Sequence, residues 1–171
     1  MKRGYAKEQV YKLIEFMRSE IKDICLRTTI MTGYPGEGKK EFKELYDFVE
    51  DIKFDRLGVF TYSEEENTYS ATHFKDDITQ KEKQERADKI MELQRKISGQ
   101  KNKKMVGKRI KVIIDRREGD FFIGRTEADS PEIDNEVLVK TNKSIKTGNF
   151  YQVSVTGADN YDLYAELNEN Q

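Results

Sequence analysis

The residues with the clearest chemical potential lie at positions 27–37, which read Arg-Thr-Thr-Ile-Met-Thr-Gly-Tyr-Pro-Gly-Glu. The β-branched run before Gly33 predicts a strand, and the glycines on either side of Pro35 break it before a helical pattern begins. Such a strand–turn–helix connection offers backbone N–H groups and lets a ligand approach the chain closely. The same pattern is typical of an ordinary strand-to-helix turn, so it indicates a candidate binding edge without specifying a ligand.

A second candidate edge follows at residues 56–62, where Arg-Leu-Gly-Val-Phe-Thr-Tyr predicts another strand. Phe60 and Tyr62 close this strand and could supply an apolar and aromatic wall beside the first turn. Residues of this kind are also what a protein core requires. Binding and core packing are therefore both open readings of these two side chains.

The sequence excludes several kinds of catalytic chemistry. Cys25 is the only cysteine and His73 the only histidine. One thiol cannot form an internal disulfide, a zinc knuckle or a metal-cluster site unaided, and we expect Cys25 to behave as a small buried hydrophobe. A lone histidine after an acidic loop gives no sign of a metal site or a catalytic triad. We therefore expect neither a metal site nor catalytic residues in this chain.

The composition is that of a globular chain rich in charge. Its 171 residues include 31 Lys+Arg and 32 Asp+Glu, for a formal net charge of -1, and 36% are hydrophobic. The longest stretch without a charge, residues 147–158, has 12 residues, whereas a helix that crosses a bilayer needs about 20 apolar ones. No apolar run follows the basic residues 1–3, so we expect no secretory signal. These features predict a cytoplasmic chain with no membrane partner.

Charge is distributed unevenly along the chain. Residues 1–60 and 61–104 each carry one excess basic side chain (12 against 11 and 10 against 9), whereas residues 105–171 carry 9 basic and 12 acidic ones, a balance of -3. No segment has the basic excess typical of a nucleic-acid footprint, and the last segment favours a basic partner. The acidic side chains that alternate with apolar residues in this segment are predicted to bind such a basic partner as the substrate: Glu127, Asp129, Glu132, Asp134 and Glu136.

Hydrophobic periodicity places the candidate edges among alternating helices and strands. Apolar positions at helical spacing predict helices at 7–20 and 39–51, and β-branched runs predict strands at 24–31 and 56–62. This order is typical of an α/β layer with parallel strands. A polar loop is expected at 63–77, and Thr79 with Glu82 has the spacing of a capping box that opens a long helix to residue 103.

The remainder of the chain changes character. Five short strands are predicted at 110–114, 120–125, 136–140, 150–156 and 163–167, and they indicate a small, closed, OB-like antiparallel barrel. We therefore predict an α+β chain in two parts, a partial α/β domain at 1–77 and a barrel at 105–171, joined by a linker helix at 78–104. Because two strands and two helices cannot cover a parallel sheet, we expect the first part to be a piece of a larger α/β domain, cut upstream.

Several of these segments together resemble one family, the radical S-adenosylmethionine methylthiotransferases. The family has an Arg-Thr-Thr strand leading into Gly-aromatic-Pro-Gly-Glu, which is similar to residues 27–37, and a Phe-Asp-Arg-Leu-Gly-Val-Phe-Thr-Tyr-Ser strand like residues 54–63. The barrel resembles the TRAM domain that ends these enzymes. Ala-Asp-Ser-Pro-Glu-Ile-Asp at 128–134 is similar to the RimO type, the branch that modifies ribosomal protein S-twelve. The resemblance spans essentially the whole chain, including residues 1–5.

The resemblance implies a chemistry for the parent enzyme. With two 4Fe-4S clusters as cofactors, the parent would cleave S-adenosylmethionine to a 5′-deoxyadenosyl radical and add a methylthio group to the β-carbon of an aspartate in S-twelve. Residues 1–77 would end the radical barrel, and the TRAM domain at 105–171 would hold the S-twelve protein. On matching positions, the S-adenosylmethionine site would be bordered by Arg27, Thr28, Ile30, Gly33, Pro35, Gly36, Phe60 and Tyr62. Arg27 would pair with a carboxylate, since guanidinium binds carboxylates bidentately, although a surface ion pair explains it equally well.

Two other functions stay open on the sequence alone. The chain could come from the branch that modifies tRNA, in which the TRAM domain binds RNA, or it could be a free-standing OB-like binding module. An RNA-binding barrel should show a basic stripe with exposed aromatic residues. The balance of -3 in residues 105–171 favours the basic S-twelve protein as the partner.

The chain departs from the family in its cysteines. The family has three in a Cys-x3-Cys-x2-Cys loop and three more in an N-terminal domain, and none of these is present here. We therefore predict that the polypeptide alone binds no iron–sulfur cluster and has no methylthiotransferase activity, because a cluster needs several thiolates. The test is anaerobic reconstitution followed by iron analysis and visible absorption. Near-stoichiometric iron together with a cluster absorption band would contradict the prediction.

Overall fold

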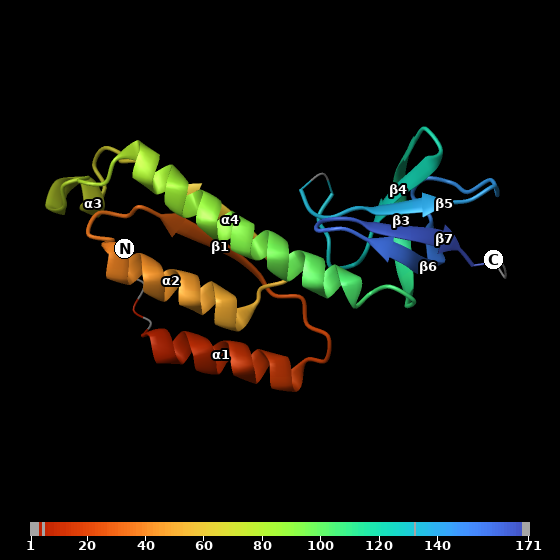
Figure 1. The fold of residues 1–171 in the computed structure, drawn as a ribbon, viewed down its shortest axis with the longest axis horizontal. Coiled ribbons are helices and arrows are strands. Elements are labelled where there is room, and N and C mark those ends of the chain that lie inside the picture. The colour runs from red at the N-terminus through yellow and green to blue at the C-terminus, as the bar shows by residue number, and fades with distance from the viewer. Residues whose placement is uncertain (1–3, 5, 132, 169–171) are drawn as a thin grey trace. The chain divides into compact units, whose positions relative to one another are not determined.

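The structure of the protein is a computed structural model that describes residues 4, 6–131 and 133–168. The chain divides into two compact units, residues 1–94 and residues 95–171. The first contains α1 (Lys7–Glu20), β1 (Arg27–Thr32), α2 (Lys39–Ile52), β2 (Arg56–Thr61), α3 (Tyr69–His73) and the first part of α4 (Gln80–Lys103) (Figure 1). The second contains the rest of α4 and the strands β3 (Arg109–Glu118), β4 (Phe121–Arg125), β5 (Val137–Lys140), β6 (Phe150–Ala158) and β7 (Leu163–Leu167).

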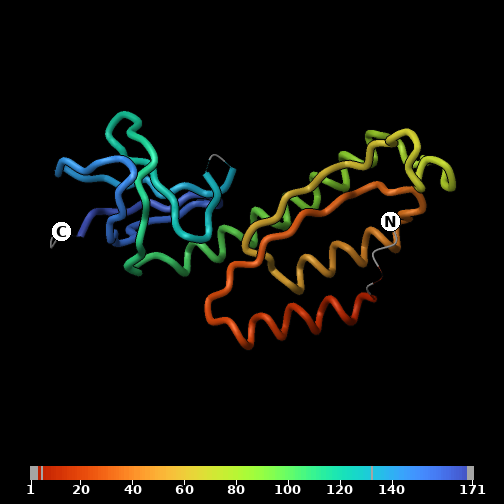
Figure 2. The backbone as a smooth tube through the Cα atoms, turned by 180° about the vertical axis from the view of Figure 1, so that it is seen from behind, coloured from red at the N-terminus to blue at the C-terminus, as the bar shows by residue number. Residues whose placement is uncertain are grey.

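The centre of the first unit is a parallel pair of strands, as the sequence predicted. β1 and β2 are in register from Arg27 opposite Arg56 to Thr32 opposite Thr61. Seen from behind, the two strands lie in front of α4 (Figure 2). Because side chains alternate along a strand, Ile30 and Thr32 share one face of β1, and both are buried there.

Apolar side chains from the helices and from the strand starts form the core of this unit. Ile14 of α1 and Ile52 of α2 are buried with Leu26 and Phe54, the residues that lead into the two strands. Arg18 ties the helices together, since its Nη2 donates to the carbonyl oxygen of Ile52 at 2.7 Å. The helix stripes predicted from periodicity therefore cover one face of the strand pair.

The segment at 63–77, which the sequence predicted as a loop, contains the short helix α3. Thr68 caps it by accepting a hydrogen bond from the Ala71 N–H at 3.3 Å. Ser70 is buried and receives a 2.9 Å hydrogen bond from the hydroxyl of Tyr62. A five-residue helix is too short to show an apolar period, so contacts with the end of β2, and not the local pattern, account for it.

α4 begins as its capping box predicted and contributes side chains to both units. The Glu82 N–H donates to Thr79 Oγ1 at 3.2 Å. In the first unit Ile90 is fully buried, and the amide of Gln94 donates to the Phe54 carbonyl at 3.1 Å. In the second unit Asn102 is buried and donates to the carbonyls of Asp159 and Tyr161. The sequence boundaries at 77 and 104 fall on either side of this helix.

The second unit is the five-stranded closed barrel that the sequence predicted, with strand order β3-β4-β5-β7-β6. Four of its strand pairs are antiparallel, but β5 and β7 are parallel. This order is that of an OB-like barrel, in which the last strand closes against the middle one. Alternate side chains fill the interior, and the buried core comprises Val112, Ile114, Val137, Val139, Ile145, Val153, Val155, Leu163 and Ala165.

A glycine allows β3 and β4 to approach closely where β3 bends. The register of the pair shifts between Ile114 and Arg116. A Cβ at Gly124 would lie 2.4 Å from the carbonyl oxygen of Ile113 and 2.5 Å from a methyl group of Val112. Gly124 is therefore required for space at a β-bulge, where strands bend to close a small barrel.

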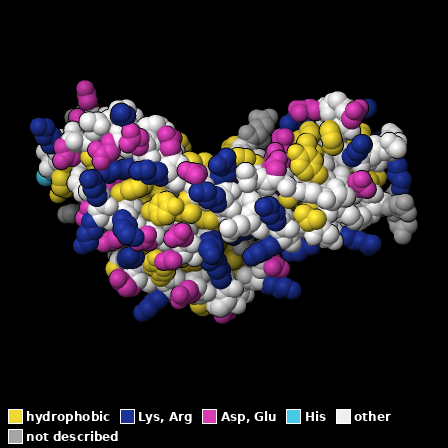
Figure 3. All heavy atoms as spheres, in the orientation of Figure 1, with side chains coloured by type: hydrophobic (Ala, Val, Ile, Leu, Met, Phe, Trp, Pro, Cys, Tyr) yellow, Lys and Arg dark blue, Asp and Glu magenta, His cyan; other side chains and the backbone are white. Residues whose placement is uncertain are grey.

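Basic, acidic and hydrophobic side chains are interspersed over the surface in the view of Figure 3. Among the residues that the structure describes, no helix is both long enough and apolar enough to cross a membrane. Exposed hydrophobic residues are nevertheless present in each unit, among them Phe60 and Phe150. Their positions matter for the candidate sites below.

The fold predicts that the two units differ in local stability. Within the described residues β1 pairs only with β2, whereas every barrel strand has two neighbours. Opening free energy follows buried contacts and paired backbone, so amides of residues 28–31 should exchange hydrogen at least about tenfold faster than those of Val153 and Val155. Exchange followed by mass spectrometry measures this. Equal protection of the two segments would mean that β1 is paired more fully than this chain alone allows.

Candidate functional site

The strand pair of the first unit has one covered face and one open face. Met31 and Phe60 are opposite each other on the open face and are 39% and 64% exposed. Thr29 and Gly58 form the preceding cross-strand pair and are exposed as well. A Cβ at Gly58 would meet nothing within 4 Å, so this position leaves open space beside the backbone. The open face therefore offers two apolar side chains next to an accessible strip of backbone.

Alternation separates the predicted S-adenosylmethionine residues between these two faces. Arg27 and Phe60 lie on the open face. Thr28 and Ile30 lie on the other face, where Ile30 is only 8% exposed. The sequence prediction did not include Thr29, Met31 or Gly58, although a period of two counted from Arg27 and Phe60 would have identified them.

The turn after β1 is held by its own glutamate. Gly33 has φ +75° and is buried, and its N–H donates to Glu37 Oε1 at 3.1 Å. Pro35 is also buried, whereas Gly36, with φ +85°, is exposed. The Gly33 N–H, which the sequence suggested as a donor to a ligand, is thus already bonded within the turn. Positive φ explains why glycine occupies both positions.

Tyr62 supports the loop after β2 and is itself buried, with 6% exposure. Its N–H donates to the Thr32 carbonyl at 2.8 Å and its hydroxyl to Ser70 Oγ at 2.9 Å. Its ring packs edge-on against Tyr34, with ring centroids 5.3 Å apart. Tyr62 therefore joins the ends of both strands to α3.

Two charged side chains of α4, which the sequence prediction did not include, reach these strand ends. Lys83 is 2% exposed, and its Nζ donates to the Tyr62 carbonyl at 3.2 Å and to Asp76 Oδ2 at 2.5 Å. Arg86 is 6% exposed and donates to the carbonyl and to Oε1 of Glu37 at 2.6 and 2.7 Å. Burial acts to lower the pKa of Arg86, but its hydrogen bonds to Glu37 and Glu82 outweigh that and raise it. The helical period of Ile90 and Ile97 continues back through both positions, but it does not indicate which groups the two charged side chains contact.

The acidic residues predicted to bind the substrate are mostly engaged within the barrel unit. Asp129 is buried and accepts from the Thr126 hydroxyl at 2.5 Å. Asp134 accepts from the Ser130 N–H at 2.6 Å, and Glu136 pairs with Arg116 at 2.8 Å. Glu127 is exposed. Glu132 lies outside the described residues, as do residues 1–3 and 5 of the opening segment.

The turn that joins β6 and β7 contains two aspartates in opposite electrostatic situations. Asp159 accepts hydrogen bonds from the N–H groups of Asp162 and Tyr161, and these lower its pKa against the effect of burial. Burial raises the pKa of Asp162, and the neighbouring charge of Asp159 adds to this, although the N–H of Glu136 donates to it. The charged form of Asp159 therefore stabilises the turn, whereas the charged form of Asp162 destabilises it.

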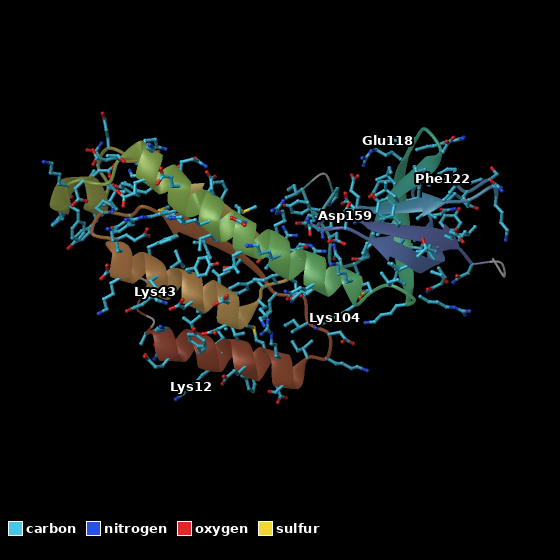
Figure 4. All side chains as sticks on the ribbon, in the orientation of Figure 1. Lys12, Lys43, Lys104, Glu118, Phe122 and Asp159 are labelled. Atoms are coloured by element: carbon cyan, nitrogen blue, oxygen red, sulfur yellow. The ribbon has the colours of Figure 1, made fainter. Side chains whose placement is uncertain are left out.

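A basic and aromatic surface lies on a different part of the barrel. The Lys111 ammonium lies over the ring of Phe150, 4.5 Å from its centroid, and the Arg117 guanidinium lies 5.4 Å from the ring of Phe122. Phe150 is 60% exposed. A hollow beside Phe122 is lined by Arg117, Lys140 and Lys143, among others. Phe122 and Asp159 project from separate parts of the barrel unit (Figure 4). We use the name basic–aromatic surface for these two groups, Lys111 with Phe150 and Arg117 with Phe122, Lys140 and Lys143.

The described residues contain no group of three or more His, Cys, Asp or Glu side chains arranged to hold a metal ion. Cys25 is half-buried, a little more accessible than the buried position expected for it. His73 stacks on Tyr69 at the end of α3, with ring centroids 3.9 Å apart. Neither residue is among those described above at the ends of β1 and β2.

Comparison with known proteins agrees with both units. The TRAM domain family matches residues 106–167, so the barrel is a TRAM domain. The whole chain is similar to curated proteins named ribosomal protein uS12 methylthiotransferase RimO. It is 49% identical to that of Phocaeicola vulgatus and 51% identical to that of Bacteroides thetaiotaomicron, each over 168 residues and 98% of this chain. The chain spans only 39% and 38% of the length of these relatives.

These matches confirm the family resemblance that the motifs carried. The chain corresponds to a C-terminal portion of the RimO-type methylthiotransferases, with a TRAM domain following an α/β part. A relative from Porphyromonas gingivalis, 48% identical over 169 residues, bears the same name and is matched over 39% of its length.

The shifted pKa values of the two aspartates in the β6–β7 turn predict opposite effects of their ionisation on the stability of the fold. Because the folded pKa of Asp162 is raised, its ionisation destabilises the fold as pH rises above about 4. Asp162→Asn should therefore gain stability relative to the wild type between about pH 3 and pH 6. Asp159→Asn is the matched control and should lose stability over the same interval, since the lowered pKa of Asp159 stabilises its charged form. Urea unfolding at several pH values measures both, and equal trends would contradict the assignment.

Proposed function

We propose that this chain forms part of a methylthiotransferase that acts on ribosomal protein uS12. The observation that carries the proposal is the identity of about half of all positions with proteins of that name across 98% of the chain, which includes both units. Since ribosomal proteins are made and assembled in the cytoplasm, we infer that the chain works there. The activity belongs to the larger protein, of which this chain represents a part.

In this proposal bound S-adenosylmethionine would supply the 5′-deoxyadenosyl radical for methylthiolation of an aspartate β-carbon, with two 4Fe-4S clusters as the other cofactors of the whole protein. The residues of this chain do not fit a cluster, because Cys25 is its only thiol.

The open face of β1 and β2 fits one side of an S-adenosylmethionine site. Phe60 and Met31 would cover the apolar part of the ligand, and the space at Gly58 would let it lie against the backbone. Arg27, on the same face, would meet a carboxylate. The other predicted residues would act indirectly, by fixing the strands and the turns that border this face. They are Thr28, Ile30, Gly33, Pro35, Gly36 and Tyr62. The role of this chain would be to bind and orient the ligand and to exclude water on one side.

The TRAM barrel is proposed to hold the uS12 protein. Its segment has a charge balance of -3, and opposite charge speeds the encounter with a basic protein. Of the four predicted contact residues that the structure describes, Glu127 is the exposed one, while Asp129, Asp134 and Glu136 form hydrogen bonds or an ion pair within the barrel unit.

RNA binding by the barrel is a second candidate, and a specific observation favours it. The basic–aromatic surface combines cations with an exposed ring, and such surfaces bind single-stranded nucleic acid through stacking and charge. The net charge of the segment does not report this local excess of cations, in which Arg117, Lys140 and Lys143 outnumber Asp120 around the hollow beside Phe122. A tRNA substrate would use this surface instead of Glu127.

Charge reversals on the barrel distinguish the two candidates. Glu127→Lys should slow association with purified uS12 by a factor of about two to five at low salt, with a smaller effect at physiological ionic strength. Lys111→Glu is the matched control, since it reverses one exposed charge on the same barrel. It should leave uS12 association unchanged or faster. Stopped-flow association with uS12 and with bulk tRNA at two salt concentrations measures this.

The opposite result would support the RNA candidate. If the wild-type chain prefers tRNA and Lys111→Glu removes that binding while Glu127→Lys does not, the barrel is an RNA-binding module and the uS12 proposal for it is wrong. A charge reversal at Asp134 would be harder to interpret, because its carboxylate accepts a hydrogen bond from the Ser130 N–H and the reversal would also remove that bond.

A further inference from the structure

The two strand-end turns of the first unit are held by the same stretch of one helix. Lys83 and Arg86 are three positions apart on α4, so they lie on one face of that helix. Lys83 contacts the end of β2 and the segment after it, while Arg86 contacts the turn after β1. Both side chains are more than nine-tenths buried.

Lys83 binds the segment after β2 by charge. Its ammonium is enclosed between the Tyr62 carbonyl and the carboxylate of Asp76, and it also lies 4.9 Å from the centroid of the Tyr62 ring. A buried ammonium that has lost its charged partner strongly destabilises the fold. The position of Asp76, and with it the segment from Tyr62 through α3, is therefore tied to Lys83.

The same lysine also packs on the turn after β1. A Cβ at Gly33 would lie 2.3 Å from Lys83 Cγ, so the methylene chain of Lys83 covers the bare Cα of this glycine. The Thr32 hydroxyl donates to the backbone carbonyl of Lys83 at 3.3 Å. Lys83 thus contacts the ends of both strands, through its stem on one side and its charge on the other.

Arg86 fixes the other end of the first turn. It donates to Glu37 at both the carbonyl and the carboxylate, and that carboxylate in turn accepts the Gly33 N–H. The second guanidinium nitrogen pairs with Glu82 at 2.7 Å. The chain from Gly33 to Glu37 is therefore closed into a loop whose shape depends on α4.

We propose that Lys83 and Arg86 are positioning residues, and that together they set the turn at 33–37 and the segment at 62–76 as one coupled rim beside the open face of β1 and β2. The proposal rests on the function proposed above in one respect, that the open face binds S-adenosylmethionine. Buried ion pairs contribute little net stability on average but can select one arrangement of the chain. α4 would select the arrangement in which the two strand ends are ready for the ligand.

Hydrogen exchange on this chain tests the coupling directly. Lys83→Met keeps the stem over Gly33 and removes the charge, and Arg86→Met removes the bonds to Glu37. Each should speed exchange by at least about tenfold in both rim segments, because a change in one is transmitted to the other. The amides of Val49 and Ile52 in the core of α2 should be unchanged. Lys89→Met, an exposed position on the same helix, is the control and should alter neither region.

If Lys83 and Arg86 only stabilised the first unit as a whole, the variants would give a different pattern of hydrogen exchange. Exchange that rises equally in the rim and at Val49 and Ile52, or that rises in only one rim segment for each variant, would overturn the proposal. Arg86→Lys, which keeps the charge but not the paired geometry, should restore part of the protection at 33–37.

Equilibrium binding of S-adenosylmethionine to the same variants then separates this proposal from the proposed function. If the wild-type chain binds it, Lys83→Met and Arg86→Met should lower the affinity at least about tenfold while Lys89→Met does not. Equal affinities in all three variants would overturn the positioning role. If the wild-type chain binds none, the open face is not the ligand surface, whereas the exchange data still decide whether the rim is coupled.

Discussion

The alternation of side chains along an extended strand governs both units of this protein. In β1 and β2 it divides the side chains into a face that carries Ile30 and Thr32 into the interior and a face that leaves Met31 and Phe60 exposed. In the barrel the same period of two places Val112 and Val153 inside and Lys111 and Gln152 outside. The proposed S-adenosylmethionine surface uses the side chains that alternation leaves outside on β1 and β2.

The exposed side chains have different chemistry in the two units. On the strand pair they are apolar and lie beside an open glycine, which suits a small ligand with apolar parts. On the barrel they include charged side chains of both signs, and Asp120 lines the same hollow as Arg117 and Lys140. A single value of net charge therefore describes neither surface, because partners respond to the local field.

Side chains of α4 hold the turns that follow both strands. Beyond the backbone ladder and the Tyr62–Thr32 hydrogen bond, most polar contacts at the strand ends converge on Lys83 and Arg86. A helix that supplies both a stem over Gly33 and an ammonium at Asp76 constrains two loops at once. That arrangement explains why a glycine and a buried lysine occur together at the point where a site would form.

The sequence by itself determined the order of helices and strands, the parallel pair, the closed barrel and the family, because periodicity, capping and glycine turns are local signals that tertiary contacts here reinforce. Thr79 opened α4 where its spacing predicted. Only the tertiary structure decided the register that sets Met31 opposite Phe60, that α3 forms beside Tyr62, and that Asp129 and Asp134 hold their own loop. Those features depend on residues far apart in sequence, such as Lys83 with Gly33 and Arg86 with Glu37, and no local pattern records such contacts.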